Sequence, residues 1–231
     1  MCNMYKYFIS SLLICCFAST LNGQDIEKTE EQNDSTKQFK INSFRLEVDV
    51  SPVVTSFLNR GETYNYEAAI QFEINNKFYP VFEMGYGGAE KSAASGIVYQ
   101  GDALFYRLGM DFNLIKPKAG VVQKNNFFLV GGRLGFSHFN YDLFGVEITN
   151  NYWGTTDTQD MTKPSSNLWF EITAGVRVEI VKNVYIGWTV RSKNMLTQVK
   201  EGAYKAFHVP GFGIYGDGGV WGFSYLLGYK F

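Results

Sequence analysis

The chain has 231 residues, of which 45% are hydrophobic and 17% aromatic, enough for a single domain with a large apolar surface. Its formal net charge is −1 at pH 7 and its basic residues form no tract, so the composition argues against nucleic acid as a partner. The cysteines are Cys2, Cys15 and Cys16, so a chain without its first segment has no thiol for a disulfide or a thiolate metal site.

Residues 1–23 have the pattern of a secretory signal peptide. Lys6 supplies a positive start, residues 7–17 form a short apolar run, and a cleavage site follows at 21–23. The run is shorter than the ~20 residues of a spanning helix. A lipoprotein signal is disfavoured, because the residue before the acylated cysteine should be small and Ile14 is not.

Residues 24–38 are rich in Glu, Asp, Asn, Gln, Ser and Thr. A segment of this composition cannot bury enough apolar surface to offset the entropy that ordering costs. It is therefore predicted to be a disordered periplasmic lead-in, followed by one domain over residues 39–231.

Apolar residues recur at every second position in eight segments of that domain. Alternate side chains of a β-strand point to opposite faces, so each segment predicts a strand with one apolar face and one polar or small face. Pro80 falls within the third segment and predicts a β-bulge, because it cannot donate a ladder hydrogen bond. The segments are residues 44–51, 64–75, 78–87, 103–112, 128–137, 168–179, 184–191 and 221–231.

The connections between these segments alternate in length. Long ones are predicted over residues 52–63, 88–102, 140–167 and 193–219, and shorter ones over 75–77, 114–126 and 181–183. An even strand count with this alternation predicts an all-β fold, an eight-stranded antiparallel up-and-down transmembrane β-barrel with long extracellular loops and short periplasmic turns. Both termini are then periplasmic, and the location is the outer membrane.

The polar faces carry many charged side chains. An eight-stranded barrel has an interior only wide enough for side chains, and buried charges are costly unless they pair. These residues are therefore predicted to form an ion-paired network that fills the lumen: Arg45, Glu47, Asp49, Glu67, Glu73, Glu83, Arg107, Asp111, Arg133, Glu171, Arg177, Glu179 and Arg191, with Lys230 from the last segment.

The inverse arrangement is a soluble periplasmic ligand-binding barrel, with its apolar face inside. The aromatic residues of the apolar faces favour the membrane barrel, because they gather towards the segment ends, where interfacial girdles lie.

The last segment ends in Phe223-Ser224-Tyr225-Leu226-Leu227-Gly228-Tyr229-Lys230-Phe231. This pattern is similar to the C-terminal signal of outer-membrane barrels, with Tyr225, Leu227, Tyr229 and Phe231 in the signal positions. Residues 39–231 resemble the small outer-membrane barrels typified by the OmpA membrane domain and OmpX, and a Gram-negative family of outer-membrane barrels of unknown function. The resemblance implies recognition by the barrel-assembly machinery and a surrounding of outer-membrane lipids and lipopolysaccharide.

An outer-membrane lipid-modifying enzyme, a lipid A or phospholipid hydrolase or acyltransferase, is the alternative function. Its candidate residues are Ser137, His138, His208 and Glu147. Ser137 and His138 are neighbours on a strand and should point to opposite faces. His208 could approach Ser137 only if the last long loop folds over the mouth of the barrel. A catalytic site requires its residues in a defined geometry, and the presence of suitable residue types is not enough. A non-enzymatic protein is therefore predicted.

Residues 211–216 match the dinucleotide fingerprint G-x-G-x-x-G, but no helical pattern follows. They are predicted to be a flexible glycine loop, and no cofactor is predicted. The acidic residues of the 140–167 loop match no calcium-loop spacing, so no metal is predicted either.

Tyr152 and Trp153 lie in the predicted 140–167 loop, where their rings could be exposed to bind an extracellular partner or could pack on the rim. The predicted role is structural, in envelope integrity, or surface interaction through the loops, with a narrow channel as a further alternative.

Overall fold

The computed structural model describes residues 41–52, 62–75, 77–115, 126–149, 156–197, 205–214 and 218–231. All of them belong to the unit 39–231. The signal peptide over 1–23, the lead-in over 24–38, and Tyr152 with Trp153 lie outside the described residues, and what was predicted for them stays a prediction. In the part of the chain that is described, no helix is long and apolar enough to cross a membrane.

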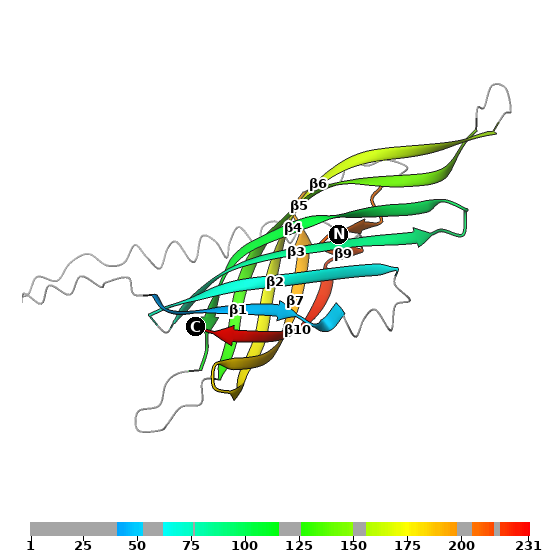
Figure 1. Cartoon of the computed structure of the whole chain (residues 1–231). Helices are drawn as coiled ribbons and strands as arrows, with labels where there is room; N and C mark the ends of the chain where they lie inside the picture. The colour runs from blue at the N-terminus through cyan, green and yellow to red at the C-terminus, as the bar shows by residue number, and fades with distance from the viewer. Residues whose placement is uncertain are drawn as a thin grey trace, which may run out of the picture. The chain divides into compact units, whose positions relative to one another are not determined.

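Eight antiparallel strands close into a barrel in the order β1-β10-β7-β6-β5-β4-β3-β2 (Figure 1). A separate two-stranded sheet, β8 with β9, lies between β7 and β10 in the sequence. The strands are β1 (Ile41–Asp49), β2 (Thr63–Ile74), β3 (Phe78–Ser92), β4 (Val98–Asn113), β5 (Phe127–Thr149), β6 (Thr156–Val181), β7 (Val184–Met195), β8 (His208–Val209), β9 (Gly213–Ile214) and β10 (Val220–Lys230).

The barrel has two distinct ends. We call the turn end the one where β1 begins and β10 finishes. There, residues 75–77, 114–126 and 182–183 connect β2 to β3, β4 to β5 and β6 to β7. Asn75 and Asn183 have positive φ values of 51° and 67°, which asparagine tolerates in tight turns. The opposite end, with residues 50–62, 93–97, 150–155 and 196–219, is the loop end.

Two of the predicted long loops are mostly strand, which corrects the sequence analysis. β3 and β4 are joined by residues 93–97 alone, and β5 and β6 extend to 23 and 26 residues as a long hairpin at the loop end (Figure 1). The alternation continues beyond Ser137, but the apolar residues change faces. Phe139, Tyr141 and Leu143 point inward, whereas Leu134 and Phe136 just before Ser137 point outward.

The predicted bulge at Pro80 is also wrong. The pairs Gln71 with Val81 and Ile74 with Phe78 lie on either side of it in one register, so no extra residue is inserted. Pro80 is paired with Met110 in the ladder to β4. The ring is accommodated by leaving out the ladder pairs opposite it on β2, since proline lacks only the N–H donor.

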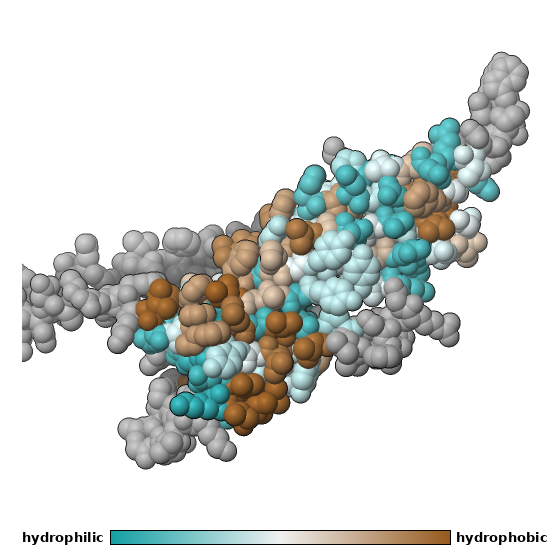
Figure 2. Space-filling model, in the orientation of Figure 1, coloured by the Kyte–Doolittle hydropathy of each residue, from teal (hydrophilic) through white to brown (hydrophobic). Residues whose placement is uncertain are grey.

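The wall of the barrel turns its apolar side chains outward and its charges inward. Leu108 is 67% exposed on the outer face, while its neighbour Arg107 is 1% exposed inside. The soluble barrel with an apolar interior is therefore wrong for this part of the wall. Figure 2 shows apolar side chains over the wall, with hydrophilic ones more frequent towards the β5–β6 hairpin.

Apolar residues do fill the interior at the two ends. Tyr79, Phe127, Leu129 and Tyr185 form a small cluster near the turn end. A larger cluster lies near the loop end, and a layer of charged side chains separates the two. The larger cluster is made of Ala89, Tyr99, Phe105, Phe139, Tyr141, Leu143, Val146, Trp169, Ala206, Val209 and Phe212.

Candidate functional site

The middle of the lumen holds a network of ion pairs centred on Glu83. Its carboxylate accepts hydrogen bonds from Arg191 Nη1 at 2.6 Å, Arg107 Nη1 at 2.9 Å and Arg133 Nε at 3.0 Å. Glu67 accepts from Arg107 Nη1 at 2.8 Å and from Arg191 Nη2 at 2.9 Å. Five residues from β2, β3, β4, β5 and β7 are thus joined by ion pairs inside the barrel.

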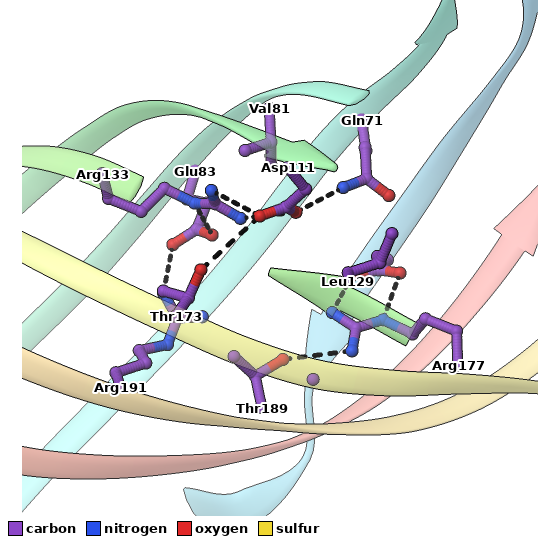
Figure 3. Close-up of a pocket in the computed structure, with 12 residues that line it drawn as sticks. Gln71, Val81, Glu83, Asp111, Leu129, Arg133, Thr173, Arg177, Thr189 and Arg191 are labelled. Atoms are coloured by element: carbon purple, nitrogen blue, oxygen red, sulfur yellow. Dashed lines mark hydrogen bonds and ion pairs between the residues drawn. The ribbon is translucent and has the colours of Figure 1, made fainter. Parts of the chain in front are cut away.

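Further pairs extend this network. Arg133 binds Asp111 through both Nη atoms at 2.8 Å, and Gln71 donates to the same carboxylate at 2.7 Å (Figure 3). Glu171 lies 2.9 Å from Arg107 Nε. Arg177 is bidentate to Glu47, at 2.7 and 2.9 Å. We call these nine ionised residues the lumen network: Glu47, Glu67, Glu83, Arg107, Asp111, Arg133, Glu171, Arg177 and Arg191.

The lumen network leaves almost no free space. The cavity among its side chains has a volume of about 10 Å³, around the limit for a single water molecule. Glycines on the inner face make this packing possible. A Cβ at Gly109 would overlap Arg133 Cδ, and one at Gly187 would overlap Arg177 Cδ. The long arginines therefore lie flat over positions that lack a side chain.

The residues predicted for this network are placed as follows. Arg45, Asp49 and Glu73 are buried beside it, together with the nine residues above. Glu179 does not join: it is half-buried at the turn end, accepts a hydrogen bond from Asn183 N at 2.9 Å, and has no ion pair in the described part. Sequence reasoning missed Gln71 and Lys193. Both stand at every second position along their strands together with the other inward-facing residues, and this spacing could have been used to predict them.

Residues 205–214, which we call the plug, fold into the mouth of the barrel. Val209 and Phe212 are buried in the larger apolar cluster, where Phe212 meets the Trp169 ring edge-on at 6.0 Å. The plug backbone is held by three inward side chains: Arg107 Nη2 donates to Gly211 O at 2.9 Å, Lys193 Nζ to the same oxygen at 2.7 Å, and Tyr99 Oη to His208 O at 2.8 Å.

The glycine sequence at 211–216 was predicted to be a flexible loop, and its described part is instead a packed hairpin. Gly211 has a φ of 79°, and a Cβ there would lie 2.5 Å from the Phe105 ring. Glycine is required at this position both by the backbone conformation and by the close contact. Among the described residues of this stretch there is a strand turn and no helix, whereas the dinucleotide fingerprint requires a strand that leads into a helix.

The candidate catalytic residues are not assembled into one site. Ser137 is fully buried and its hydroxyl donates to Leu104 O at 3.2 Å. His138 points outward, and its Nδ1 lies 2.6 Å from Ser166 Oγ on the exposed face of the β5–β6 hairpin. In the described residues, no hydrogen bond joins Ser137 to His208 and no carboxylate contacts His138. Glu147 is exposed near the tip of the hairpin.

His208 is the buried titratable group of the plug, whereas Lys205 is exposed. Its side chain is buried, and Nδ1 has no hydrogen-bond partner in the described part of the chain. Burial, with a smaller contribution from the charge of Lys193, lowers its pKa to about 4. The imidazole is therefore neutral in the folded protein near pH 7.

A family model described as "Domain of unknown function (DUF6048)" matches residues 4–231 of this chain. The comparison with curated proteins gave no match. Among solved structures, the chain is similar to the N-terminal β-barrel domain of Pseudomonas aeruginosa OprF, with 13% identity and a TM-score of 0.40, covering 84% of this chain and 100% of that one. It is also similar to Ail, the attachment invasion locus protein of Yersinia pestis, with 11% identity and a TM-score of 0.40, covering 82% and 94%. Because both TM-scores are low, the barrel is identified from the strand pairing of this chain itself.

Proposed function

The chain belongs to the family described as a domain of unknown function (DUF6048), and from its own geometry we propose that it is an outer-membrane β-barrel with a closed lumen. Its role is structural, in envelope integrity, or surface interaction through the loop end. The observation that carries this proposal is the polarity of the wall, with apolar side chains outside and an ion-paired lumen inside.

The outer face of the wall suits a hydrocarbon environment. Large apolar side chains are exposed on strands around the ring, among them Leu108 on β4, Leu134 on β5, Ile172 on β6 and Leu227 on β10. Soluble proteins rarely expose contiguous apolar patches larger than a few hundred Å². Here the exposed apolar side chains follow the strands around the ring, which is the arrangement of a membrane-spanning barrel.

The apolar belt has a limit on the long hairpin. On β5, the outward residues are apolar or small from Phe128 to Phe136 and polar at His138, Asn140 and Asp142. A stretch of this length matches the ~9–11 residues with which a tilted strand crosses a bilayer. The polar residues beyond it suit water, so the loop end would lie outside the membrane.

Aromatic side chains mark both limits of the belt. Near the turn end, Phe44 stacks on Phe231 at 4.8 Å. Towards the loop end, Tyr64 lies 6.1 Å from Tyr86. Amphipathic rings are favoured at membrane interfaces. We propose that the turn end faces the periplasm and the loop end the exterior, with lipopolysaccharide around the outer rim.

The assembly route is part of this proposal. The four signal residues are Tyr225, Leu227 and Tyr229 on β10 and Phe231 directly after it, and all four side chains are exposed on the outside. Their side chains are therefore available to the barrel-assembly machinery before insertion and to lipid afterwards.

The test is fractionation of the expressing bacterium, followed by gel mobility with and without heating. We expect the chain in the outer-membrane fraction, with a heat-dependent shift, and protease cleavage of whole cells confined to loop-end connections. Recovery from the soluble periplasm without a shift would contradict the proposal. In planar bilayers the purified barrel should conduct no ions, because the lumen network leaves a cavity of only about 10 Å³.

A further inference from the structure

A serine and a histidine are paired on the outer face of the β5–β6 hairpin. Ser166 Oγ on β6 lies 2.6 Å from His138 Nδ1 on β5, and both residues are exposed. They stand directly opposite each other in the ladder between the two strands. Opposite side chains of an antiparallel pair are close neighbours, so the register of the hairpin holds this contact. Ser166 was not among the candidates from the sequence, since 28 positions separate it from His138.

The two side chains have the chemistry of a nucleophile and its base. A neutral imidazole that carries its proton on Nε2 has a lone pair on Nδ1, which accepts a hydrogen bond from the Ser166 hydroxyl. A serine hydroxyl becomes a good nucleophile when an adjacent base takes its proton, and 2.6 Å is within reach of such a transfer. Because both side chains are exposed, a substrate can reach them without opening the barrel.

The backbone at Ser166 offers a donor for an oxygen that becomes negatively charged. Leu168 N donates to Thr197 Oγ1 at 2.7 Å, and Leu168 O accepts from Leu196 N at 2.9 Å, so these backbone groups point away from β5. Backbone groups alternate sides along a strand, so the Ser166 N–H points the same way. Among the described residues, β7 pairs with β6 only from Trp169 onward. The Ser166 N–H can therefore donate to the oxygen of a carbonyl that Ser166 Oγ attacks.

The position of the pair on the wall indicates the substrate. The next outward residues towards the turn end are Phe136 and Leu168, which are opposite each other and are 46% and 42% exposed. The next outward residues towards the loop end are Asn140 and Pro164. The pair therefore lies at the limit of the apolar belt. An acyl chain that packs on Phe136 and Leu168 would bring an ester group at its end to Ser166.

We propose that Ser166 and His138 hydrolyse acyl esters of lipids in the outer leaflet. The site goes beyond the proposed function, and its lipid substrate rests on the membrane placement given there. Ser166 Oγ attacks the ester carbonyl carbon while His138 Nδ1 takes the hydroxyl proton. The C–O bond to the alcohol breaks, and the alcohol leaves with that proton. Water then cleaves the acyl-serine with His138 as base, which releases the fatty acid and restores Ser166.

The surroundings of His138 predict slow turnover. In the described part of the chain no carboxylate contacts its ring. A serine–histidine pair whose orienting carboxylate is replaced loses about 10⁴-fold in kcat but keeps its chemistry. The reactivity of the serine itself is therefore the first property to measure.

The first experiment treats the full purified barrel in detergent with a fluorophosphonate, which an activated serine attacks at phosphorus with release of fluoride. Mass spectrometry then locates the label, which we expect on Ser166. His138→Gln should slow labelling by about 10²–10⁴-fold, the contribution of a general base. Ser165→Ala should label as the parent does, because Ser165 accepts a hydrogen bond from the buried Asn167 on the other face of β6. An unlabelled Ser166 in a barrel with a heat-dependent gel shift would overturn the proposal.

The second experiment identifies the lipid. The parent and Ser166→Ala, both checked for the gel shift, are incubated in mixed micelles with ester-linked phosphatidylcholine, its ether-linked analogue or purified lipopolysaccharide, and released fatty acid is measured. We expect release from at least one of the two ester lipids, none from the ether lipid, and none with Ser166→Ala. Labelling of Ser166 without release from either ester lipid would refute the lipid substrate. Recovery of the chain from the soluble periplasm without a gel shift would instead contradict the proposed function, so the two failures are distinguishable.

Discussion

At the scale of single residues, Glu83 shows how the interior is stabilised. Three arginines converge on one carboxylate that is itself 4% exposed. None of the four groups can return to water without opening the barrel. Removing one partner therefore lowers the free energy of unfolding by far more than breaking a surface ion pair does.

We predict that Glu83→Gln lowers the free energy of unfolding by about 3–5 kcal/mol, the usual cost of leaving a buried charge unpaired. Glu90→Gln is the control, because Glu90 lies on the same strand with its side chain exposed. It should change stability by less than about 0.5 kcal/mol. Urea unfolding of the refolded barrel measures the stability of both variants. Equal stability of the two would show that the ion pairs of Glu83 do not stabilise the barrel.

His208 gives the plug a pH dependence with a definite sign. Its pKa is lowered from 6.5 to about 4 in the folded state, chiefly by burial. The opened plug therefore binds a proton more readily than the closed one, so closure is fully stable above about pH 6.5 and weakens as the pH falls towards 4. We predict that the protection factors of the plug amides, which are corrected for the pH dependence of intrinsic exchange, fall over this interval. His208→Gln should remove this fall, and a variant that keeps it would assign the effect to another group.

At the scale of elements, side chains along the β5–β6 hairpin keep pointing alternately inward and outward. Towards the loop end, however, apolar side chains lie on the inner face instead of the outer face. From Gly131 to Ser137 the inward residues of β5 are polar or glycine and the outward ones apolar or glycine; above Ser137, Phe139, Tyr141 and Leu143 point inward. Each half of the hairpin follows its surroundings. In the proposed membrane setting the belt faces an apolar phase, whereas the loop end packs its apolar residues on the plug.

The plug depends on Phe212, which is 1% exposed against Trp169. We predict that Phe212→Ala weakens plug docking by about 3–5 kcal/mol, as for other buried aromatic truncations. The plug should then become sensitive to protease while the heat-dependent gel shift is retained. Ile214→Ala is the control on the same hairpin, because Ile214 is 51% exposed. Loss of the gel shift in Phe212→Ala would mean that the plug is needed for the barrel itself.

At the scale of the whole molecule, the closed ring and its outer belt determine which phase the wall contacts. An arginine substituted on the outer face should destabilise the barrel if that face contacts lipid, and should have little effect if it contacts water. We predict that Leu108→Arg, in the middle of the belt on β4, destabilises the inserted barrel by about 2–4 kcal/mol. Gln100→Arg, on the outer face of the same strand beyond the belt, should cost about 0–1 kcal/mol. Refolding into vesicles measures the difference, and similar stabilities would argue against a membrane around this wall.

Much of this architecture follows from local sequence. Alternation is a property of the strand backbone, so the eight strands and the inward direction of residues such as Arg107 and Glu171 could be predicted. The same reasoning failed where local polarity changed. The fifth strand was predicted to end at Ser137, although it continues to Thr149. Glu179 was predicted to lie in the lumen network, whereas its carboxylate accepts a hydrogen bond from Asn183 N in the turn.

The sequence by itself determined the number of strands, the parity of each side chain and the phase that each face prefers, because these depend on neighbours along the chain. Only the tertiary structure decided the partners. Glu83 meets Arg191 across 108 positions, and Arg107 reaches Gly211 across 104. Such contacts depend on the closure of the ring and the register of every strand pair, which are collective properties of the whole sheet. The position of the plug arises only when the barrel is closed.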